Sequence, residues 1–252
     1  MNMGMKRKYG WRPGLPDHRD LIFAPSRKAL TVQNVDLRDE CPPIVDQKAL
    51  GSCTANAIAG AHEFCQMKEG EAAFPPSRLF IYFNERAMEG TTSYDAGAVI
   101  RDGCKSIAKQ GVCPEAQWPY IASKLTKKPM ARCYADALAH QAIKYMRVSQ
   151  TVGDMTACLA AGFPFVFGIS VYESFESDAV AKTGIVPMPK ASESCLGGHA
   201  MLCVGWDRKK VQFIFRNSWG PKWGDKGYGY IPVSYMTSPF LASDFWTVRV
   251  VE

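Results

Sequence analysis

The sequence predicts an α+β fold of two lobes with a cleft between them. Two features of the residue pattern indicate it: the stretch from Val35 to about Arg132 is largely helical, and after Ala142 short apolar runs alternate with Gly and Pro turns. A helical half followed by a strand-rich half is typical of the α+β class. A chain of 252 residues can bury a substantial core as one large domain or two small lobes.

Residues 1–34 differ in composition from the rest of the chain. Aromatic, Pro and Gly residues are interspersed here, and they favour an extended, aromatic-anchored arm over a helix; they are Tyr9, Trp11, Pro13, Gly14 and Pro16. We therefore expect three regions: an N-terminal arm (1–34), a helical lobe (35–132) and a strand-rich lobe (133–252).

Three helices are expected in the helical lobe. One spans about 52–68, with Ser52 as its N-cap. A second begins after Pro75-Pro76-Ser77, and a third spans about 98–109 and stops at Gly111, a natural C-cap. The second helix presents its apolar residues on one face: Leu79, Phe80, Phe83 and Ala87.

Three apolar runs in the second half are expected to be strands: Phe163–Val171, His199–Trp206 and Val211–Arg216. The residues Asp207-Arg208-Lys209-Lys210 separate the last two runs and are typical of a hairpin turn. Pairing through this turn would place His199 and the residue that follows the last run, Asn217, near the same end of adjacent strands.

Composition argues against several classes of function. The formal charge of +6 is modest and scattered, so the densest basic stretch, Lys124 to Arg132, is interpreted as a solvated loop and not as a nucleic-acid patch. No apolar run reaches the roughly 18–20 residues that cross a bilayer, and no apolar stretch follows the basic start as in a secretory signal. We expect a monomer with no membrane or nucleic-acid partner, in a compartment that the sequence leaves open.

Cofactor sites find no support either. The nine cysteines form no CxxC pair, so the spacings of structural zinc sites are missing, and no Gly-rich phosphate loop, HExxH or CxxCH pattern occurs. We expect no metal and no cofactor. Nine is an odd number, so at least one thiol has no partner within the chain, and spacing alone assigns no disulfide among the others.

Cys53 has the most suitable setting for a nucleophile. It follows Gly51-Ser52 at the expected start of a helix, where free backbone N–H groups and the helix dipole favour a thiolate. Taken alone the signal is weak, because a buried structural cysteine is the commoner interpretation of any single cysteine.

The base is found by elimination among four histidines. His62 lies nine residues along the same helix, about 13 Å from Cys53 and too far for proton transfer. His140 is expected at a helix end in a structural role, and His18 lies in the arm. His199 follows Gly197-Gly198 and opens a strand, where the glycines permit close approach of other backbone.

Asn217 could hold the His199 imidazole in one tautomer without adding a buried charge. The other interpretation of Asn217-Ser218-Trp219-Gly220 is a turn with an aromatic plug, and for this motif in isolation that interpretation is preferred.

Together these blocks resemble the papain-like cysteine peptidases of family C1. The matching segments are Gln47 to Cys53, Gly198-His199-Ala200, Asn217 to Gly220 with Trp223-Gly224, Val35 to Arg38, and Trp118-Pro119-Tyr120. Any one block is moderately specific for this family. All of the blocks in order, with compatible spacing from Val35 to the C-terminus, are very specific for it. The resemblance implies a helical lobe, an antiparallel barrel-like lobe and an active-site cleft between them.

The resemblance also implies roles for individual residues. Cys53, His199 and Asn217 would cleave peptides through a thioester acyl-enzyme, with the Gln47 amide and the Cys53 N–H binding the oxyanion. Trp219 would shield the bond between Asn217 and His199. The residues that would line the substrate cleft are Ala96, Gly97, Gly198, Ala200, Trp219 and Asp244. If Asp244 points inward, a basic substrate side chain is accepted beside bulky apolar ones; if it points to solvent, only the apolar preference remains.

Four positions depart from the family pattern. Thr54 follows the nucleophile where plant and animal members carry Trp, and Leu50 and Asn84 stand where half-cystines are expected. Cys133 aligns with a family half-cystine but lacks that partner. The sequence pattern resembles bacterial members of the family most. Because these half-cystines are missing, we do not assume the conserved disulfides of the secreted enzymes.

Several interpretations stay open. The arm is too short for the family's usual helical prosegment, and it either crosses the cleft as a short inhibitory prosegment or straps the body away from the site. The main expectation is an endopeptidase acting on peptides or proteins. The alternatives are an exopeptidase or acyl transferase on the same scaffold, or a catalytically silent peptide-binding homologue. Retention of Cys53, His199, Asn217 and Gln47 together argues against the last.

Overall fold

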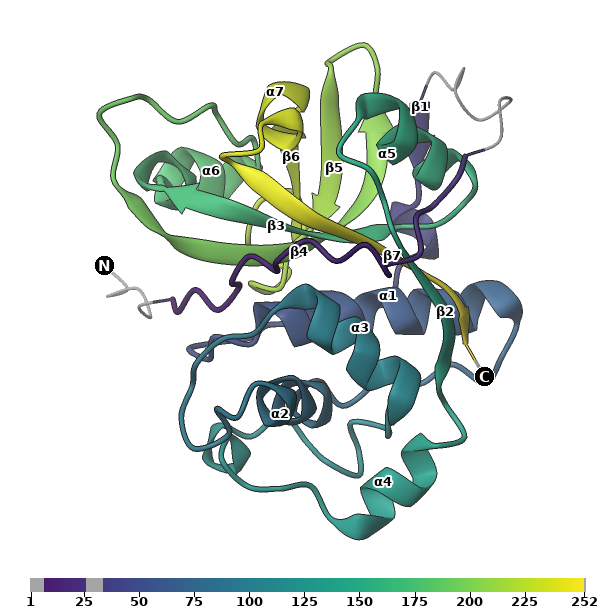
Figure 1. The fold of residues 1–252 in the computed structure, drawn as a ribbon. Coiled ribbons are helices and arrows are strands. Elements are labelled where there is room, and N and C mark those ends of the chain that lie inside the picture. The colour runs from purple at the N-terminus through teal and green to yellow at the C-terminus, as the bar shows by residue number, and fades with distance from the viewer. Residues whose placement is uncertain (1–6, 26–33, 252) are drawn as a thin grey trace.

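The computed structural model describes residues 7–25 and 34–251, and it confirms the α+β class (Figure 1). Most of the helical residues of the first half gather on one side, and an antiparallel sheet forms the other. The helices are α1 (Cys53–Glu69), α2 (Arg78–Met88), α3 (Ile100–Lys109), α4 (Ala131–Ala137), α5 (Val152–Ala160), α6 (Asp178–Thr183) and α7 (Val233–Thr237), with short 3-10 turns η2 (Arg38–Glu40), η3 (Ala122–Lys124) and η4 (Glu173–Glu176).

The sheet has seven strands: β1 (Asn34–Asp36), β2 (Ala142–Arg147), β3 (Phe165–Tyr172), β4 (Cys195–Asp207), β5 (Gln212–Arg216), β6 (Tyr228–Pro232) and β7 (Ala242–Val251). Their order is β2-β7-β3-β4-β5-β6, and β1 pairs with β4. The three apolar runs of the sequence form β3, β4 and β5. The turn between β4 and β5 spans 208–211, one residue later than expected, and Val211 adopts a positive φ of 54° there.

Helix α1 packs between the two halves of the molecule. It contacts α2 and α3 on one side and β4 and β7 on the other. Every residue from Cys53 to His62 is buried, which requires a helix that is small and apolar on most sides. Its Ala and Gly residues meet this need: Ala55, Ala57, Ala59, Gly60 and Ala61. At Gly60 even a Cβ would come within 3.3 Å of the Arg216 Nε atom, so the sheet approaches the helix backbone closely.

The helix ends differ from the expectations in detail. Ser52 precedes α1, but its side chain makes no capping bond to the helix; its Oγ lies 2.5 Å from the Tyr120 hydroxyl instead. Ser77 does cap α2, because its Oγ accepts a bond from the Phe80 N–H. Helix α3 begins at Ile100, two residues later than expected, and Ala87 at the end of α2 is exposed instead of facing the core.

The described part of the arm, residues 7–25, runs between the helices and the sheet (the purple trace in Figure 1). Its backbone–backbone hydrogen bonds to the rest of the molecule lie at two places. Near its start the Trp11 N–H donates to the Gly198 carbonyl, and the Arg12 N–H donates to the Ala98 carbonyl. Further on, the Phe23 N–H donates to the carbonyl of Arg147 in β2. Within residues 7–25 and 34–251, no helix is both long and apolar enough to cross a membrane.

Candidate active site

Cys53 is the first residue of α1, as expected, but its thiol is not activated in this structure. The sulfur is fully buried, and the backbone N–H groups of Ala200 and Gly10 donate to it. Burial nevertheless dominates and raises the pKa of the Cys53 thiol to about 11, because removal of water penalises the thiolate. The helix-terminus argument predicted a lowered pKa. It is wrong for this structure because it did not include the desolvation of a fully buried thiol.

The imidazole of His199 is held by Asn217. Strands β4 and β5 pair in the expected way, and Asn217 directly follows β5, so the His199 Nε2 atom lies 2.9 Å from the Asn217 Oδ1 atom. The same Oδ1 accepts a bond from the Ser218 backbone N–H, which can only donate. The atom facing the ring is therefore an oxygen, and Nε2 carries the proton of the neutral ring.

The second ring nitrogen, Nδ1, is left as an acceptor. It is buried and has no hydrogen-bond partner among the described residues. The pKa of His199 is lowered to about 4, first by burial and further by the positive charge of Arg7, and the bond from Asn217 only partly opposes this. The imidazole is neutral at pH 7, with Nδ1 free to take a proton.

Aromatic rings enclose the pair formed by His199 and Asn217. Trp219 stacks on the imidazole with 4.8 Å between ring centroids and an angle of 29° between planes. Phe175 and Tyr9 meet the same ring edge-on, at 6.3 and 6.2 Å. Trp219 is 5% exposed, so the pair is screened from water and its hydrogen bond is strengthened by a low local dielectric.

Gln47 connects the segment before Cys53 to the Asn217 segment. Its Oε1 accepts a bond of 2.5 Å from the Ser218 hydroxyl, and its Nε2 donates to the Leu50 carbonyl at 2.9 Å. Each primary amide has two N–H groups, so one donor of Gln47 remains available after the bond to Leu50. Ser218 and Tyr120 were not singled out from the sequence as site residues. The Tyr120 hydroxyl donates to the Gln47 carbonyl at 2.8 Å, and the triplet around Tyr120 was the available signal.

Most of the residues expected to line the cleft touch the arm. A Cβ at Gly97 would lie 2.1 Å from the Gly10 carbonyl oxygen, and one at Gly198 would lie 2.3 Å from the Trp11 carbonyl oxygen. Ala200 is buried beside the Cys53 sulfur.

Ala98, which follows the expected cleft residues Ala96 and Gly97, is hydrogen-bonded to the arm. Its N–H donates to the Gly10 carbonyl at 2.7 Å, and its carbonyl accepts from the Arg12 N–H at 3.0 Å. The assignment of Ala96 to the substrate cleft stays a prediction, and the strand-like pairing of this segment with the arm could not be derived from the glycine alone.

Asp244 points inward. Its carboxylate accepts a bond from the Trp11 indole N–H at 3.2 Å and from the Gly14 backbone N–H at 2.7 Å. Asp244 is 4% exposed and has a positive φ of 58°, and burial raises the pKa of its carboxyl group. The Trp11 ring lies directly over Gly168, where a Cβ would come within 2.0 Å of it. Trp11 thus fills a pocket with an acid at one wall.

The other histidines lie outside this site. His62 is buried in α1, and its Nε2 atom lies 3.3 Å from the His140 carbonyl oxygen. Burial lowers the pKa of His62 to about 4. His18 lies in an exposed part of the arm.

Comparison with known proteins identifies the family. The profile described as "Papain family cysteine protease" matches residues 31–238. The chain belongs to the papain family of cysteine proteases. The resemblance found in the sequence is thereby confirmed, and the chain is a papain-like cysteine peptidase, a hydrolase.

Papain-family relatives cover this chain to different extents. Xylellain, a cysteine protease from Xylella fastidiosa, is 41% identical, and its crystal structure superposes with a TM-score of 0.92 over 98% of this chain and 97% of that one. An uncharacterized peptidase C1-like protein of Acanthamoeba polyphaga mimivirus is 40% identical over 98% of this chain and 88% of its own length. Cysteine proteinase 3 of Dictyostelium discoideum is 25% identical; the chain covers 57% of its length.

The lowered pKa of the buried His199 imidazole can be tested by titration. With the arm in place, we expect His199 to titrate near pH 4, because burial lowers its pKa from 6.5 and the ring is neutral above that range. The measurement is an NMR titration of histidine ring protons, with His199→Gln and His62→Gln variants to assign the two low-pKa signals. Circular dichroism checks that the fold persists at each pH. A His199 midpoint above pH 6 would contradict the expectation.

Proposed function

We propose that this chain is a thiol endopeptidase whose own N-terminal arm occupies the cleft and holds it inactive. The observation that carries the proposal is the position of Gly10. Its N–H donates to the Cys53 sulfur, and its carbonyl is bonded to the Ala98 N–H. A substrate carbonyl must reach the space that Gly10 fills, so the arm and a substrate compete for it.

The proposed reaction uses the groups already in position. His199 accepts the Cys53 proton at Nδ1, and the sulfur attacks the scissile carbonyl carbon. The oxyanion is bound by the remaining N–H of the Gln47 amide and by the Cys53 backbone N–H. His199 then gives its proton to the leaving amine, which leaves a thioester on Cys53. Water activated by His199 hydrolyses the thioester, while Asn217 keeps the imidazole oriented throughout.

The arm has the geometry of an inhibitor and not of a substrate. In the described part of the arm, no carbonyl oxygen is hydrogen-bonded to Gln47; the Gly10 oxygen accepts from the Ala98 N–H instead. Without an oxyanion donor on its carbonyl, the Gly10 peptide bond has no stabilisation for a tetrahedral intermediate. The arm can therefore lie beside the nucleophile without being cut.

The arm also holds the reacting pair in its unreactive protonation state. With a pKa of about 11 for Cys53 and about 4 for His199, both groups are neutral between these values. Departure of the arm would admit water and remove the Arg7 charge from the imidazole. Both changes favour the charged forms, so the thiolate–imidazolium pair would form in the open state.

An endopeptidase is favoured over an exopeptidase because the arm passes the nucleophile on both sides. On one side the Arg7 guanidinium lies 4.3 Å from the centre of the Trp219 ring, and on the other Trp11 reaches Asp244. A cleft that holds chain on both sides of Cys53 has room for the interior of a polypeptide.

The pocket that holds Trp11 suggests the preferred substrate side chain. The Trp11 ring that lies over Gly168 indicates space for a bulky residue, and the inward Asp244 suits one that carries a donor or a positive charge. We propose that basic side chains, Arg above all, are accepted there together with large apolar ones.

Release of the arm is tested with Gly10→Ala. The added Cβ would lie 1.7 Å from the Gly51 carbonyl oxygen, so the arm backbone must move away while the cleft itself is unchanged. Overpacking of this kind costs about 1–3 kcal/mol, so we expect Cys53 to be labelled roughly 5- to 150-fold faster by an epoxysuccinyl inhibitor. The readout is intact mass against time.

The control for this experiment is Leu15→Ala, which changes an arm residue that is 83% exposed and should leave the labelling rate as it is. Cys53→Ala should take up no label. Equal rates in Gly10→Ala and Leu15→Ala would count against restraint by the arm.

The role of Gln47 is tested in the Gly10→Ala background. Loss of one oxyanion donor lowers kcat by about 10²–10³-fold in comparable sites, so Gln47→Ala should do the same with little change in KM. Ser218→Ala is the matched control, because it removes the hydroxyl that holds the Gln47 Oε1 but leaves the amide donors. If both variants lose activity equally, Gln47 acts only through its structural contacts.

The role of Asp244 is tested by comparing peptides with Arg or Leu at the second residue before the cut, again in the Gly10→Ala background. Asp244→Asn keeps the shape of the side chain and removes its charge. We expect the ratio of kcat/KM for Arg over Leu to fall roughly tenfold or more, since a buried charge pair is lost. An unchanged ratio would show that Asp244 does not contribute to the preference for Arg over Leu in the substrate.

A further inference from the structure

Two buried cysteines far from the active site lie side by side. Cys113 follows α3, and Cys133 lies in α4; both are fully buried free thiols in this structure, and the Cys133 side chain is one of the groups that act on the Cys113 thiol. The backbone explains why they meet. A Cβ at Gly111 would lie 1.7 Å from the Ala137 carbonyl oxygen, and the Val112 N–H donates to the His140 carbonyl at 3.1 Å, so this segment runs along α4.

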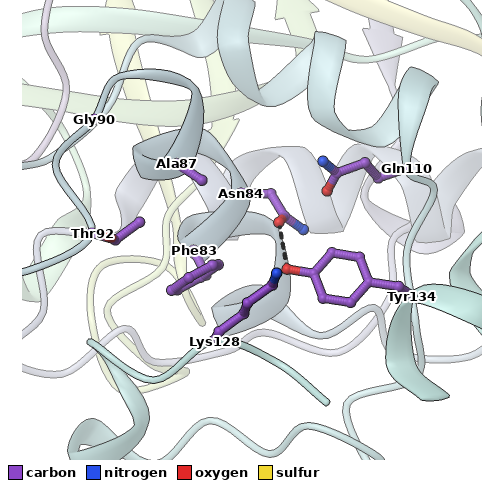
Figure 2. A pocket seen from close by; sticks show the side chains of 8 residues that line it. All are labelled: Phe83, Asn84, Ala87, Gly90, Thr92, Gln110, Lys128 and Tyr134. Carbon is purple, nitrogen blue, oxygen red and sulfur yellow. Dashed lines mark hydrogen bonds between the residues drawn. The ribbon is translucent and has the colours of Figure 1, made fainter. Parts of the chain in front are cut away.

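Cys133 cannot pair with position 84, where the resemblance places a half-cystine. Asn84 stands there, and its Oδ1 accepts a bond of 2.9 Å from the hydroxyl of Tyr134, the residue after Cys133 (Figure 2). Asn84 is 1% exposed and held by this contact. The thiol that Cys133 meets instead is that of Cys113.

We propose that Cys113 and Cys133 form a disulfide that closes the loop of residues 114–132. The oxidant is a small-molecule disulfide such as oxidised glutathione. One protein thiolate attacks it to give a mixed disulfide and one equivalent of glutathione; the second protein thiolate then displaces the other equivalent. Two protein thiols are oxidised, one small disulfide is reduced to two thiols, and the two protons that the protein thiols lose end on the two glutathione thiols.

The bond would stabilise a loop that supports the active site. The Trp118 carbonyl accepts a bond from the Ser77 hydroxyl at 2.6 Å, and the Tyr120 hydroxyl contacts Ser52 and the Gln47 carbonyl. The loop also holds the basic stretch from Lys124 to Arg132. Linking its ends would restrict the unfolded chain and hold Tyr120 against the residues that flank Cys53.

Burial determines when the bond forms. It raises the pKa of Cys113 to about 12, so little thiolate exists in the folded, reduced chain at neutral pH. A pocket of about 450 Å³ lined by Tyr134 and Asn84 brings solvent next to α4, but it does not expose either sulfur (Figure 2). The disulfide therefore forms during folding in an oxidising buffer and slowly afterwards.

The test uses the full chain with Cys53→Ala, so that the nucleophile neither reacts with glutathione nor digests the sample. The protein is refolded in a glutathione redox buffer, its free thiols are blocked with N-ethylmaleimide, and it is digested without reduction. We expect a linked peptide pair containing Cys113 and Cys133. We also expect a Tm roughly 5–10 °C above that of the reduced sample, the effect of closing a loop of this length.

Matched variants separate this pair from the other thiols. Cys113→Ser and Cys133→Ser should each lose the linked peptides and the difference in Tm between oxidised and reduced samples. Cys104→Ser, which changes a buried thiol of α3, should keep both. If a serine variant fails to fold, the alanine variant replaces it. A refolded chain without the linked pair, or with Cys113 linked elsewhere, would overturn the proposal.

Discussion

The burial of α1 between the helical side and the sheet is the constraint on which the remaining structure depends. A helix packed on all sides must be small and apolar, and the stretch from Ala55 to Ala61 is largely alanine and glycine for this reason. Cys53 is the first residue of this helix, and its sulfur lies next to Ala200 of strand β4. His199 directly precedes Ala200 in β4, so the strand that contacts the Cys53 sulfur also provides the imidazole. Strand β4 pairs with β5, and this pairing brings Asn217, which follows β5, to the imidazole.

The same burial makes the site sensitive to what covers it. A thiol and an imidazole that are both removed from water keep their neutral forms, because each charged form loses its hydration. The directions of the pKa shifts at Cys53 and His199 are opposite, and both disfavour the ion pair that a cysteine peptidase needs. A segment that adds or removes a few contacts at the cleft can therefore change reactivity without moving any catalytic side chain.

In the proposed restraint, the arm acts through a glycine and a tryptophan. Gly10 lies where any Cβ would overlap Gly51, which allows backbone to approach the sulfur, and Trp11 contributes a large buried surface together with a bond to Asp244. A second attachment at Phe23, on β2, would keep the arm near the body if the first were released. The proposed link between Cys113 and Cys133 would act elsewhere, on the loop whose Tyr120 hydroxyl donates to the Gln47 carbonyl.

The sequence by itself determined the α+β class, the family, and the pairing of His199 with Asn217, because these follow from local patterns: apolar periodicity, a turn between two strands, and short blocks of fixed spacing. It could not determine what depends on contacts between distant segments. The path of the arm, the inward direction of Asp244, the bonding of Ala98 to the arm and the raised pKa of Cys53 are all of this kind. Each results from desolvation or backbone pairing between residues far apart in the chain, and the free energy of such contacts is set only when tertiary packing brings the segments together.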